Sequence, residues 1–179
     1  MSLNTPRDKR ALTTKELCIF ALLGAIMYCS KALLEFLPNI HLVGVLTIAY
    51  TLVYRFKALI PLYVFVFLCG LFGGFATWWI PYLYVWLPLW GITMILPRKT
   101  GKFTFFLYSS VCALHGLLFG ALYAPAQAVM FGLDFNGMIA WIIAGLPFDL
   151  IHAGGNFVAG FLIVPIASVL HKINDLSFR

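Results

Sequence analysis

The stretch ALIPLYVFVFLCGLFGGFA, residues 58–76, is apolar, aromatic or small at every position and carries no charge. A straight helix needs about 20 such residues to cross the roughly 30 Å hydrocarbon core of a membrane. Comparable runs recur along most of the chain, which is 63% hydrophobic and only 10% charged. In a soluble domain about a quarter of the residues are charged. We therefore predict a polytopic membrane protein and exclude a soluble enzyme.

Charged residues, prolines and glycines divide these runs into six expected transmembrane helices. Their ranges are Lys15–Leu37, Leu42–Tyr54, Ala58–Ala76, Trp78–Leu96, Phe103–Tyr123 and Met138–Leu170. The last segment is too long to cross straight, so we expect Gly145 and Pro147 to kink or divide it. The first helix is followed by no small-residue cleavage site, so we expect it to stay in the mature protein. The predicted fold class is an all-α membrane protein, with one transmembrane domain over residues 1–179.

The positive charges predict how the helices are oriented, because cytoplasmic loops retain lysine and arginine. With six spans, only Lys31 of the 12 basic residues falls on the side opposite the termini. The others are Arg7, Lys9, Arg10, Lys15, Arg55, Lys57, Arg98, Lys99, Lys102, Lys172 and Arg179. Both termini are thus predicted to be cytoplasmic. The net charge of +6 indicates topology and not nucleic-acid binding, since no basic face is interleaved with aromatic residues.

Three connections on the outer side carry polar and aromatic residues but little charge. They cover residues 35–41, 76–82 and 124–137 and contain Asn39, His41, Trp78, Trp79, Tyr82 and Gln127. An interfacial belt explains Trp78 and Trp79 without any ligand, because one edge of the indole ring is apolar and the other is wet. It explains Trp86 less well, since this residue lies two turns into its segment. Trp86 is therefore a candidate wall of a cavity.

In the last segment Asp149, His152 and Asn156 follow one another at i, i+3 and i+7, which places them on one helix face. A carboxylate within a membrane usually faces a cavity or a partner group. The three residues therefore form either a ligand-binding cluster or an internal packing contact. His115 precedes Gly116, with Gly120 one turn further on, and these small residues permit close approach of another helix. The His115 imidazole is then a candidate partner of Asp149.

Signatures of catalysis or of bound cofactors are missing from the sequence. It contains no phosphate-binding GxxxxGK[ST] loop, no nucleophile elbow, no HExxH and no paired carboxylates at catalytic spacing. His41, His115 and His152 lie on different segments, and the four cysteines are scattered singly, so no metal site is predicted. We expect a non-catalytic protein without a cofactor.

A family resemblance is carried by an AxxxA pattern in the first helix, Ala21 to Ala25, and by three blocks of sequence. The blocks are LPNIH at 37–41, ATWWIPY at 76–82 and LYAPAQA at 122–128. In these residues, and in its length, span count and orientation, the chain resembles the substrate-binding S-components of energy-coupling-factor (ECF) vitamin transporters of Gram-positive bacteria. The AxxxA pattern alone is common in membrane helices.

The resemblance implies a subunit in the bacterial plasma membrane that binds a vitamin from outside and topples to release it inside. Its implied partners are a transmembrane coupling subunit and two ABC ATPases, which hydrolyse the ATP. Ala21 and Ala25 would face the coupling subunit; the alternative is packing against a neighbouring helix of the same chain. The implied binding site combines the outer loops with the later helices. It comprises Asn39, His41, Trp78, Trp79, Tyr82, Trp86, Gln127, Asp149, His152 and Asn156.

The cargo is inferred from the chemistry of the outer side. Its aromatic residues, its amides and its scarcity of positive charge favour a large neutral or zwitterionic ligand rich in amides, and cobalamin fits best. A small carboxylate such as pantothenate would usually meet an arginine or lysine, and the outer half offers only Lys31. Pantothenate, folate and queuosine precursors are the other candidates. The competing functions are a membrane enzyme that uses Asp149, His152 and His115 for acid–base chemistry, and an assembly protein without a ligand.

Overall fold

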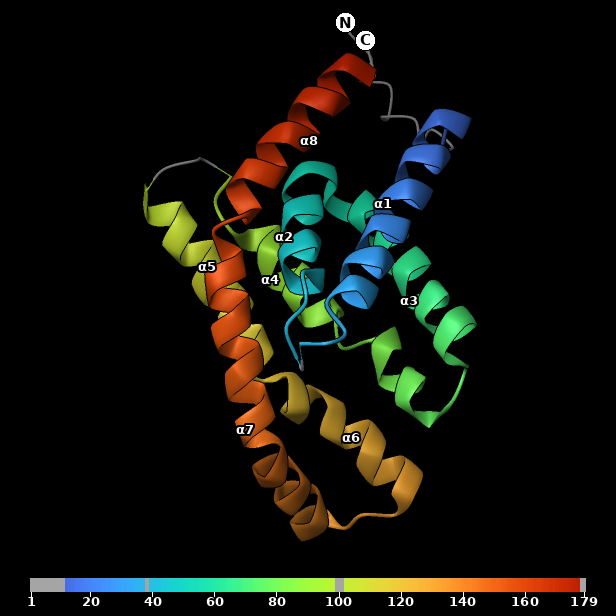
Figure 1. Cartoon of the computed structure of the whole chain (residues 1–179), viewed down its shortest axis with the longest axis vertical. Helices are drawn as coiled ribbons and strands as arrows, with labels where there is room; N and C mark the ends of the chain where they lie inside the picture. The colour runs from blue at the N-terminus through green and yellow to red at the C-terminus, as the bar shows by residue number, and fades with distance from the viewer. Residues whose placement is uncertain (1–11, 38, 99–101, 178–179) are drawn as a thin grey trace, which may run out of the picture.

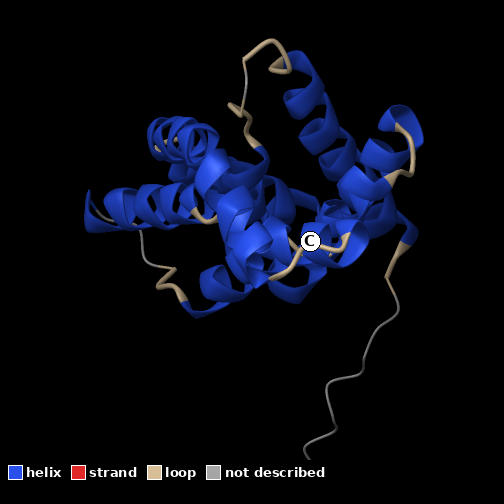
Figure 2. Cartoon of the chain, turned by 90° about the horizontal axis from the view of Figure 1, so that it is seen from below, coloured by secondary structure: helices blue, strands red, loops and turns tan. Residues whose placement is uncertain are grey.

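The computed structural model describes residues 12–37, 39–98 and 102–177, and every regular element in these ranges is helical (Figure 2). The all-α prediction is thus confirmed. The α-helices are α1 (Thr14–Leu33), α2 (Val43–Tyr54), α3 (Leu59–Gly73), α4 (Leu87–Ile95), α5 (Lys102–Leu117), α6 (Phe119–Phe131), α7 (Phe135–Gly160) and α8 (Ile163–Ser177). Two 3-10 helices, η1 (Arg55–Ala58) and η2 (Thr77–Leu83), precede α3 and α4.

Four helical stretches are long and apolar enough to cross a membrane: 14–33, 43–73, 103–131 and 135–160. Two of them are not single straight helices. The stretch 43–73 turns at Arg55, whose φ of 57° interrupts the helix between α2 and η1. The stretch 103–131 breaks at Leu118, between α5 and α6. The membrane character predicted from composition therefore has a structural counterpart in these four stretches.

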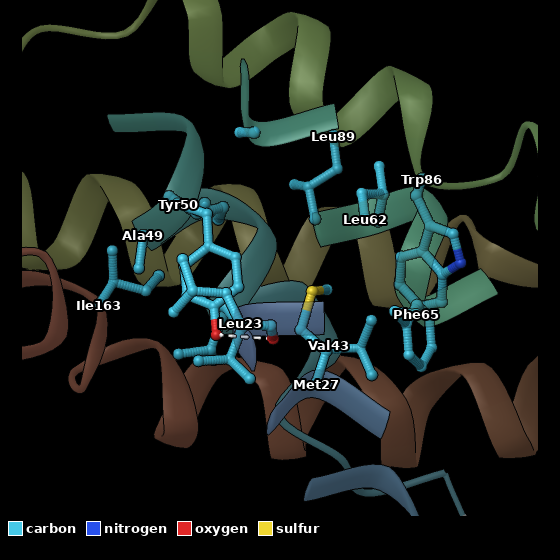
Figure 3. Close-up of a cluster of buried hydrophobic side chains, with 14 of the residues drawn as sticks. Leu23, Met27, Val43, Ala49, Tyr50, Leu62, Phe65, Trp86, Leu89 and Ile163 are labelled. Carbon is cyan, nitrogen blue, oxygen red and sulfur yellow. Dashed lines mark hydrogen bonds between the residues drawn. The ribbon is translucent and has the colours of Figure 1, made fainter. Parts of the chain in front are cut away.

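Helix α2 forms the centre of the molecule. Of its residues, all except Val53 are buried, which is typical of a helix that is apolar on every side and enclosed by others. Figure 3 shows Val43, Ala49 and Tyr50 of α2 among side chains of α1, α3, α4 and α8. The Tyr50 hydroxyl donates to the Leu23 carbonyl of α1 at 3.3 Å. This bond satisfies the one polar atom that the ring carries into the core.

Close approach of α1 to α3 and of α5 to α7 depends on glycines. A Cβ on Gly24 would lie 2.5 Å from Val64 of α3, and one on Gly160 would lie 2.6 Å from the Ser109 Cα of α5. A Cβ on Gly116 would lie 2.8 Å from Asn156 Nδ2 of α7. The sequence-based expectation that Gly116 admits a neighbouring helix is therefore confirmed.

Polar and basic residues gather at the end of the molecule where α1 begins and α8 ends, which is uppermost in Figure 1. Glu16 accepts a hydrogen bond from Thr13 in a capping box and also forms an ion pair with Lys57 of η1. Arg55 donates to the Met94 carbonyl at the end of α4. Arg98 and His171 line one small hollow together with residues of α2, α5 and α8. We call this region the basic end.

Three expected boundaries were wrong. The segment expected at 78–96 begins as the 3-10 helix η2, so only nine residues of it are α-helical, in α4. The connection expected at 124–137 is mostly helix α6, and only 132–134 remain outside helices. Gly145 and Pro147 do not divide the last segment, because α7 continues through both and the chain turns at Phe161 and Leu162 instead.

Candidate functional site

Two adjoining hollows open where α1 and α3 end, away from the basic end. The larger, of 390 Å3, lies between the last turns of α1 and α3 and the 3-10 helix η2. The smaller, of 200 Å3, lies between the connection after α1 and the helices α6 and α7. Lys31, Glu35 and Tyr82 line both. We call the two together the outer hollow; its volume lies in the range in which proteins bind small molecules.

The 3-10 helix η2 forms one wall of the outer hollow and is held by three side-chain hydrogen bonds. Trp79 Nε1 donates to the Val66 carbonyl of α3 at 2.8 Å, and the Tyr63 hydroxyl donates to the Leu83 carbonyl at 2.9 Å. From the other side, the Tyr123 hydroxyl of α6 donates to the Trp78 carbonyl. These bonds hold in place the 3-10 helix that carries Trp78 and Tyr82, which line the hollow. The Trp79 N–H is already used in the bond to Val66 and is not available to a ligand.

A pair of histidines lines the smaller part of the outer hollow. The ring centroids of His41 and His152 lie 4.7 Å apart, and the His152 ring also meets Phe119 edge-on at 5.0 Å. Asn39 lines the same part and adopts a φ of 59°. This left-handed conformation is one that asparagine tolerates better than most residues with a side chain. Asn39 thus turns the chain just before His41, whose ring contacts that of His152.

Trp86 is a buried core residue that contacts the His41 ring of this pair. The indole is 1% exposed and contacts the rings of His41, His115, Phe119 and Tyr82 at centroid distances of 5.5–5.9 Å. It does not line the outer hollow. Trp86 therefore supports the residues that line the hollow instead of forming its surface.

Several buried nitrogens of this cluster have no hydrogen-bond partner. They are His41 Nδ1, Trp86 Nε1, His115 Nδ1 and His152 Nε2. A buried polar atom without a partner costs about 1–3 kcal/mol, so such atoms are rare and call for a reason. Four of them in mutually contacting rings, two of which line a hollow, distinguish this region from the rest of the described chain.

Asp149 does not reach the outer hollow. Its two carboxylate oxygens accept from the backbone N–H of Gly120, at 3.2 and 3.1 Å. Gly120 lies in the first turn of α6, where backbone N–H groups have no partner within the helix. The carboxylate of α7 therefore caps α6 and complements the positive end of its dipole. His115 instead bonds to the Val85 carbonyl at 2.9 Å, so the expected contact between His115 and Asp149 was wrong.

The remaining predicted site residues lie apart from the outer hollow. Asn156 donates through Nδ2 to the Cys112 carbonyl at 3.1 Å and joins α7 to α5. Gln127 lies on α6, partly buried, and lines neither part of the hollow. The structure thus brings together Asn39, His41, Trp78, Tyr82 and His152 at the outer hollow. It places Trp79, Trp86, Gln127, Asp149 and Asn156 outside its lining.

Some lining residues were not predicted as site residues. They include Tyr28, Lys31, Glu35, Cys69 and Phe72. The position of Lys31 as the lone outer cation was a usable signal, and Glu35 follows it one turn later. The aromatic and thiol residues gave no signal, because residues of the same kind fill the core throughout the chain.

Burial and charge set the protonation of His41. Its pKa is lowered to about 4, first by burial and then by the positive charge of Lys31. The ring is therefore neutral at pH 7 and offers one donor and one acceptor nitrogen.

The outer hollow can bind a small molecule through aromatic faces, neutral imidazole nitrogens, an amide and two opposite charges. Among the described residues, no group of three histidine, cysteine or acidic side chains is placed to hold a metal ion. Comparisons with protein families, curated proteins and solved structures found no significant match to this chain.

Proposed function

We propose that this chain is the substrate-binding S-component of an energy-coupling-factor importer and that it takes up a vitamin. The observation that supports this most is the outer hollow, which lies away from the basic end and is lined by binding groups. Its walls come from α1, α3, η2, α6, α7 and the connection after α1. Such a hollow between helices, with a few polar groups on an aromatic wall, is typical of a ligand site.

The proposed topology has six crossings, with both termini in the cytoplasm of a bacterium. The crossings are α1, α2, α3, η2 with α4, α5, and α7 continued by α8, and the basic end faces the cytoplasm. Helix α2 has 12 residues and is about 18 Å long, shorter than the hydrocarbon core. Because α2 is enclosed by other helices, its ends need not meet lipid, and irregular backbone at membrane depth is tolerated there.

Helix α1 offers a face for the proposed coupling subunit. The small residue that packs against α3 is Gly24, whereas Ala21 is exposed and Ala25 only partly buried. The face that carries Ala21 and Ala25 is therefore not fully covered by other helices of this chain. The neighbouring Leu22 and Ile26 are exposed as well. Two alanines one turn apart allow a partner helix to approach closely. ATP would be hydrolysed by two ABC ATPases bound to the coupling subunit.

The proposed cargo is a vitamin that combines amide and charged groups. Cobalamin remains the leading candidate on residue chemistry, since aromatic rings, Asn39 and imidazoles line the hollow. A corrinoid is larger than the drug-sized ligands that hollows of this volume bury, so it would extend over the outer connections. Volume alone favours pantothenate or another compact vitamin.

A membrane enzyme built on Asp149, His152 and His115 has less support. Both Asp149 oxygens are engaged by Gly120, and His115 bonds to a backbone carbonyl. A general base must come within hydrogen-bond reach of the proton it abstracts. These three residues do not converge on one open space in the described structure, so the binding subunit is the better proposal.

Isothermal titration of the detergent-purified chain against a panel of vitamins, beginning with cobalamin and pantothenate, tests the proposal. Tight one-to-one binding of one vitamin is expected. Ala21→Trp should abolish uptake in cells that carry the coupling subunit and ATPases while binding by the isolated protein survives. Folded protein that binds no vitamin would refute the proposal, and equal loss of binding in Ala21→Trp would refute the assigned interface.

A further inference from the structure

Two opposite charges share the outer hollow. Lys31 lies in the last turn of α1, and Glu35 follows in the connection after it. Both residues line the larger and the smaller part of the hollow, and Tyr82 also lines both parts. Lys31 is the only lysine or arginine among the lining residues of the described hollows at this end. Any ligand that fills both parts therefore meets both charges.

Lys31 and Glu35 form no ion pair with each other. In the described part of the chain the one recorded ion pair joins Lys57 to Glu16, and none joins Lys31 to Glu35. Lys31 and Glu35 thus present separate charges of opposite sign to whatever enters the hollow.

A second and independent feature of the hollow also points to a ligand. His152 is 2% exposed and lines the smaller part, and its Nε2 has no hydrogen-bond partner. His41, beside it, is neutral at pH 7 because burial and Lys31 hold its pKa at about 4. The histidines therefore add hydrogen-bonding groups to the hollow, and the positive charge there comes from Lys31.

We infer that the ligand is a zwitterion whose anionic group binds Lys31 and whose cationic group faces Glu35. A carboxylate or a phosphate serves equally at Lys31, since both accept charge-assisted hydrogen bonds from an ammonium group. A purely anionic ligand would meet Glu35 as a like charge, and a purely cationic one would meet Lys31. Complementary charge of this kind contributes to specificity, because a ligand that places a like charge at either residue is disfavoured.

This inference rests on the proposed function and narrows it from vitamins in general to their zwitterionic forms. Cobalamin, which carries a phosphodiester and a cationic cobalt centre, meets the charge criterion. Pantothenate, which has only an anionic group, does not. A compact zwitterion such as thiamine monophosphate meets the criterion and is smaller.

Matched pairs of ligands on the detergent-purified full chain test the inference by titration calorimetry. Two pairs differ in charge on one scaffold: thiamine against thiamine monophosphate, and pantothenate against its alcohol panthenol. A third, cobalamin against cobinamide, removes the phosphodiester together with the rest of the nucleotide. We expect one zwitterion to bind, and its partner without the anionic group to bind about ten- to a hundredfold more weakly.

Variants assign the effect to the two residues. Lys31→Gln and Glu35→Gln should each weaken binding of the zwitterion about tenfold or more, and Lys31→Arg should retain most of it. Lys172→Gln removes the same charge at an exposed position of α8 and should leave binding unchanged. Gel filtration and circular dichroism show that each variant is folded.

The outcomes separate the inference from the function. If a vitamin binds but its affinity is unchanged in Lys31→Gln, or if an uncharged or purely anionic ligand binds as tightly as any zwitterion, the inference is overturned and the binding subunit stands. If folded wild-type protein binds none of these probes, the proposed function fails, and the inference fails with it.

Discussion

The basic end and the outer hollow differ in what their polar groups contact. At the basic end Glu16 is shared between Thr13 and Lys57, and Arg55 reaches the Met94 carbonyl through Nη2, while its Nη1 has no partner. In the outer hollow Lys31 and Glu35 form no ion pair with each other, and ring nitrogens of His41 and His152 lack partners. Polar groups that are satisfied within the chain stabilise it, whereas buried groups without partners are costly unless something else binds them. The outer hollow gathers several ring nitrogens without partners, whereas among its described residues the basic end has one such atom, on Arg55, and this difference supports the proposed ligand site.

The largest effect is expected where the support of the outer hollow is tightest. A Cβ on Gly120 would lie 2.4 Å from Asp149 Oδ2, so Gly120→Ala should displace the carboxylate and weaken the cap of α6. Overpacking and loss of the cap together should cost about 3 kcal/mol. Thermal unfolding in detergent measures this.

Gly154 supplies the matched control for Gly120. It lies on α7 with open space around it, so Gly154→Ala should be neutral or stabilise by about 0.5–1 kcal/mol. If both substitutions had the same effect, the close approach of α7 to α6 would not be what supports the site.

The next effect is the dependence of stability on pH through His41. Because the pKa of His41 is about 4 in the folded protein and about 6.5 when unfolded, protonation favours the unfolded state. Stability from neutral His41 is thus complete above pH 6.5 and is lost as the pH falls to 4. The loss should be on the order of 2 kcal/mol, less than the full shift implies because at pH 4 the folded protein is itself about half protonated at His41.

The variant His41→Gln removes this titration. Melting temperatures measured from pH 7 to pH 4 should fall less steeply in the variant than in the wild type. Parallel curves for the two proteins would show that His41 is not held neutral by its surroundings.

A smaller effect is expected at Asp149. Asp149→Ala removes the acceptor for Gly120 N–H and should cost about 1 kcal/mol, while Asp149→Asn keeps an acceptor and should cost less. Ligand affinity should change little in Asp149→Asn, since the carboxylate does not line the outer hollow. A large loss of affinity with unchanged melting temperature would instead make Asp149 a ligand contact.

The smallest effect is expected at the basic end. The ion pair between Lys57 and Glu16 is partly exposed, and such pairs contribute about 0–1 kcal/mol. Lys57→Met should therefore lower the melting temperature slightly and leave ligand affinity unchanged. Reduced affinity in this variant would contradict the proposal that ligand binding is confined to the outer hollow.

The parts of the fold that were predictable are those marked by charge or by long apolar runs. Helix α2 was expected over Leu42–Tyr54 and occupies Val43–Tyr54, because Arg55 and Lys57 interrupt the apolar run. Helix α6 was not predicted, because no charge marks the break at Leu118, and the carboxylate that caps α6 lies 29 residues away in sequence. Gly145 and Pro147 were expected to kink or divide the last segment, and α7 runs through both without a break.

Residue type predicted only some of the residues that line the outer hollow. Asn39, His41, His152, Trp78 and Tyr82 line the outer hollow, whereas Trp79, also predicted from its type and position, bonds to the Val66 carbonyl. Asp149 and Asn156 share the helix face of His152 but are satisfied by backbone groups of α6 and α5. Periodicity shows which residues share a face, but it does not show what faces them.

The sequence by itself determined the membrane character, the all-helical class and the position of the cations between the apolar runs. These follow from composition and from the local spacing of charge, which act within about 20 residues. Only the tertiary structure decided that Lys31 and Glu35 line the same hollow as His41 and His152, and that Asp149 does not line it. Contacts between helices distant in sequence decide which polar groups are already satisfied, and therefore which remain to bind a ligand.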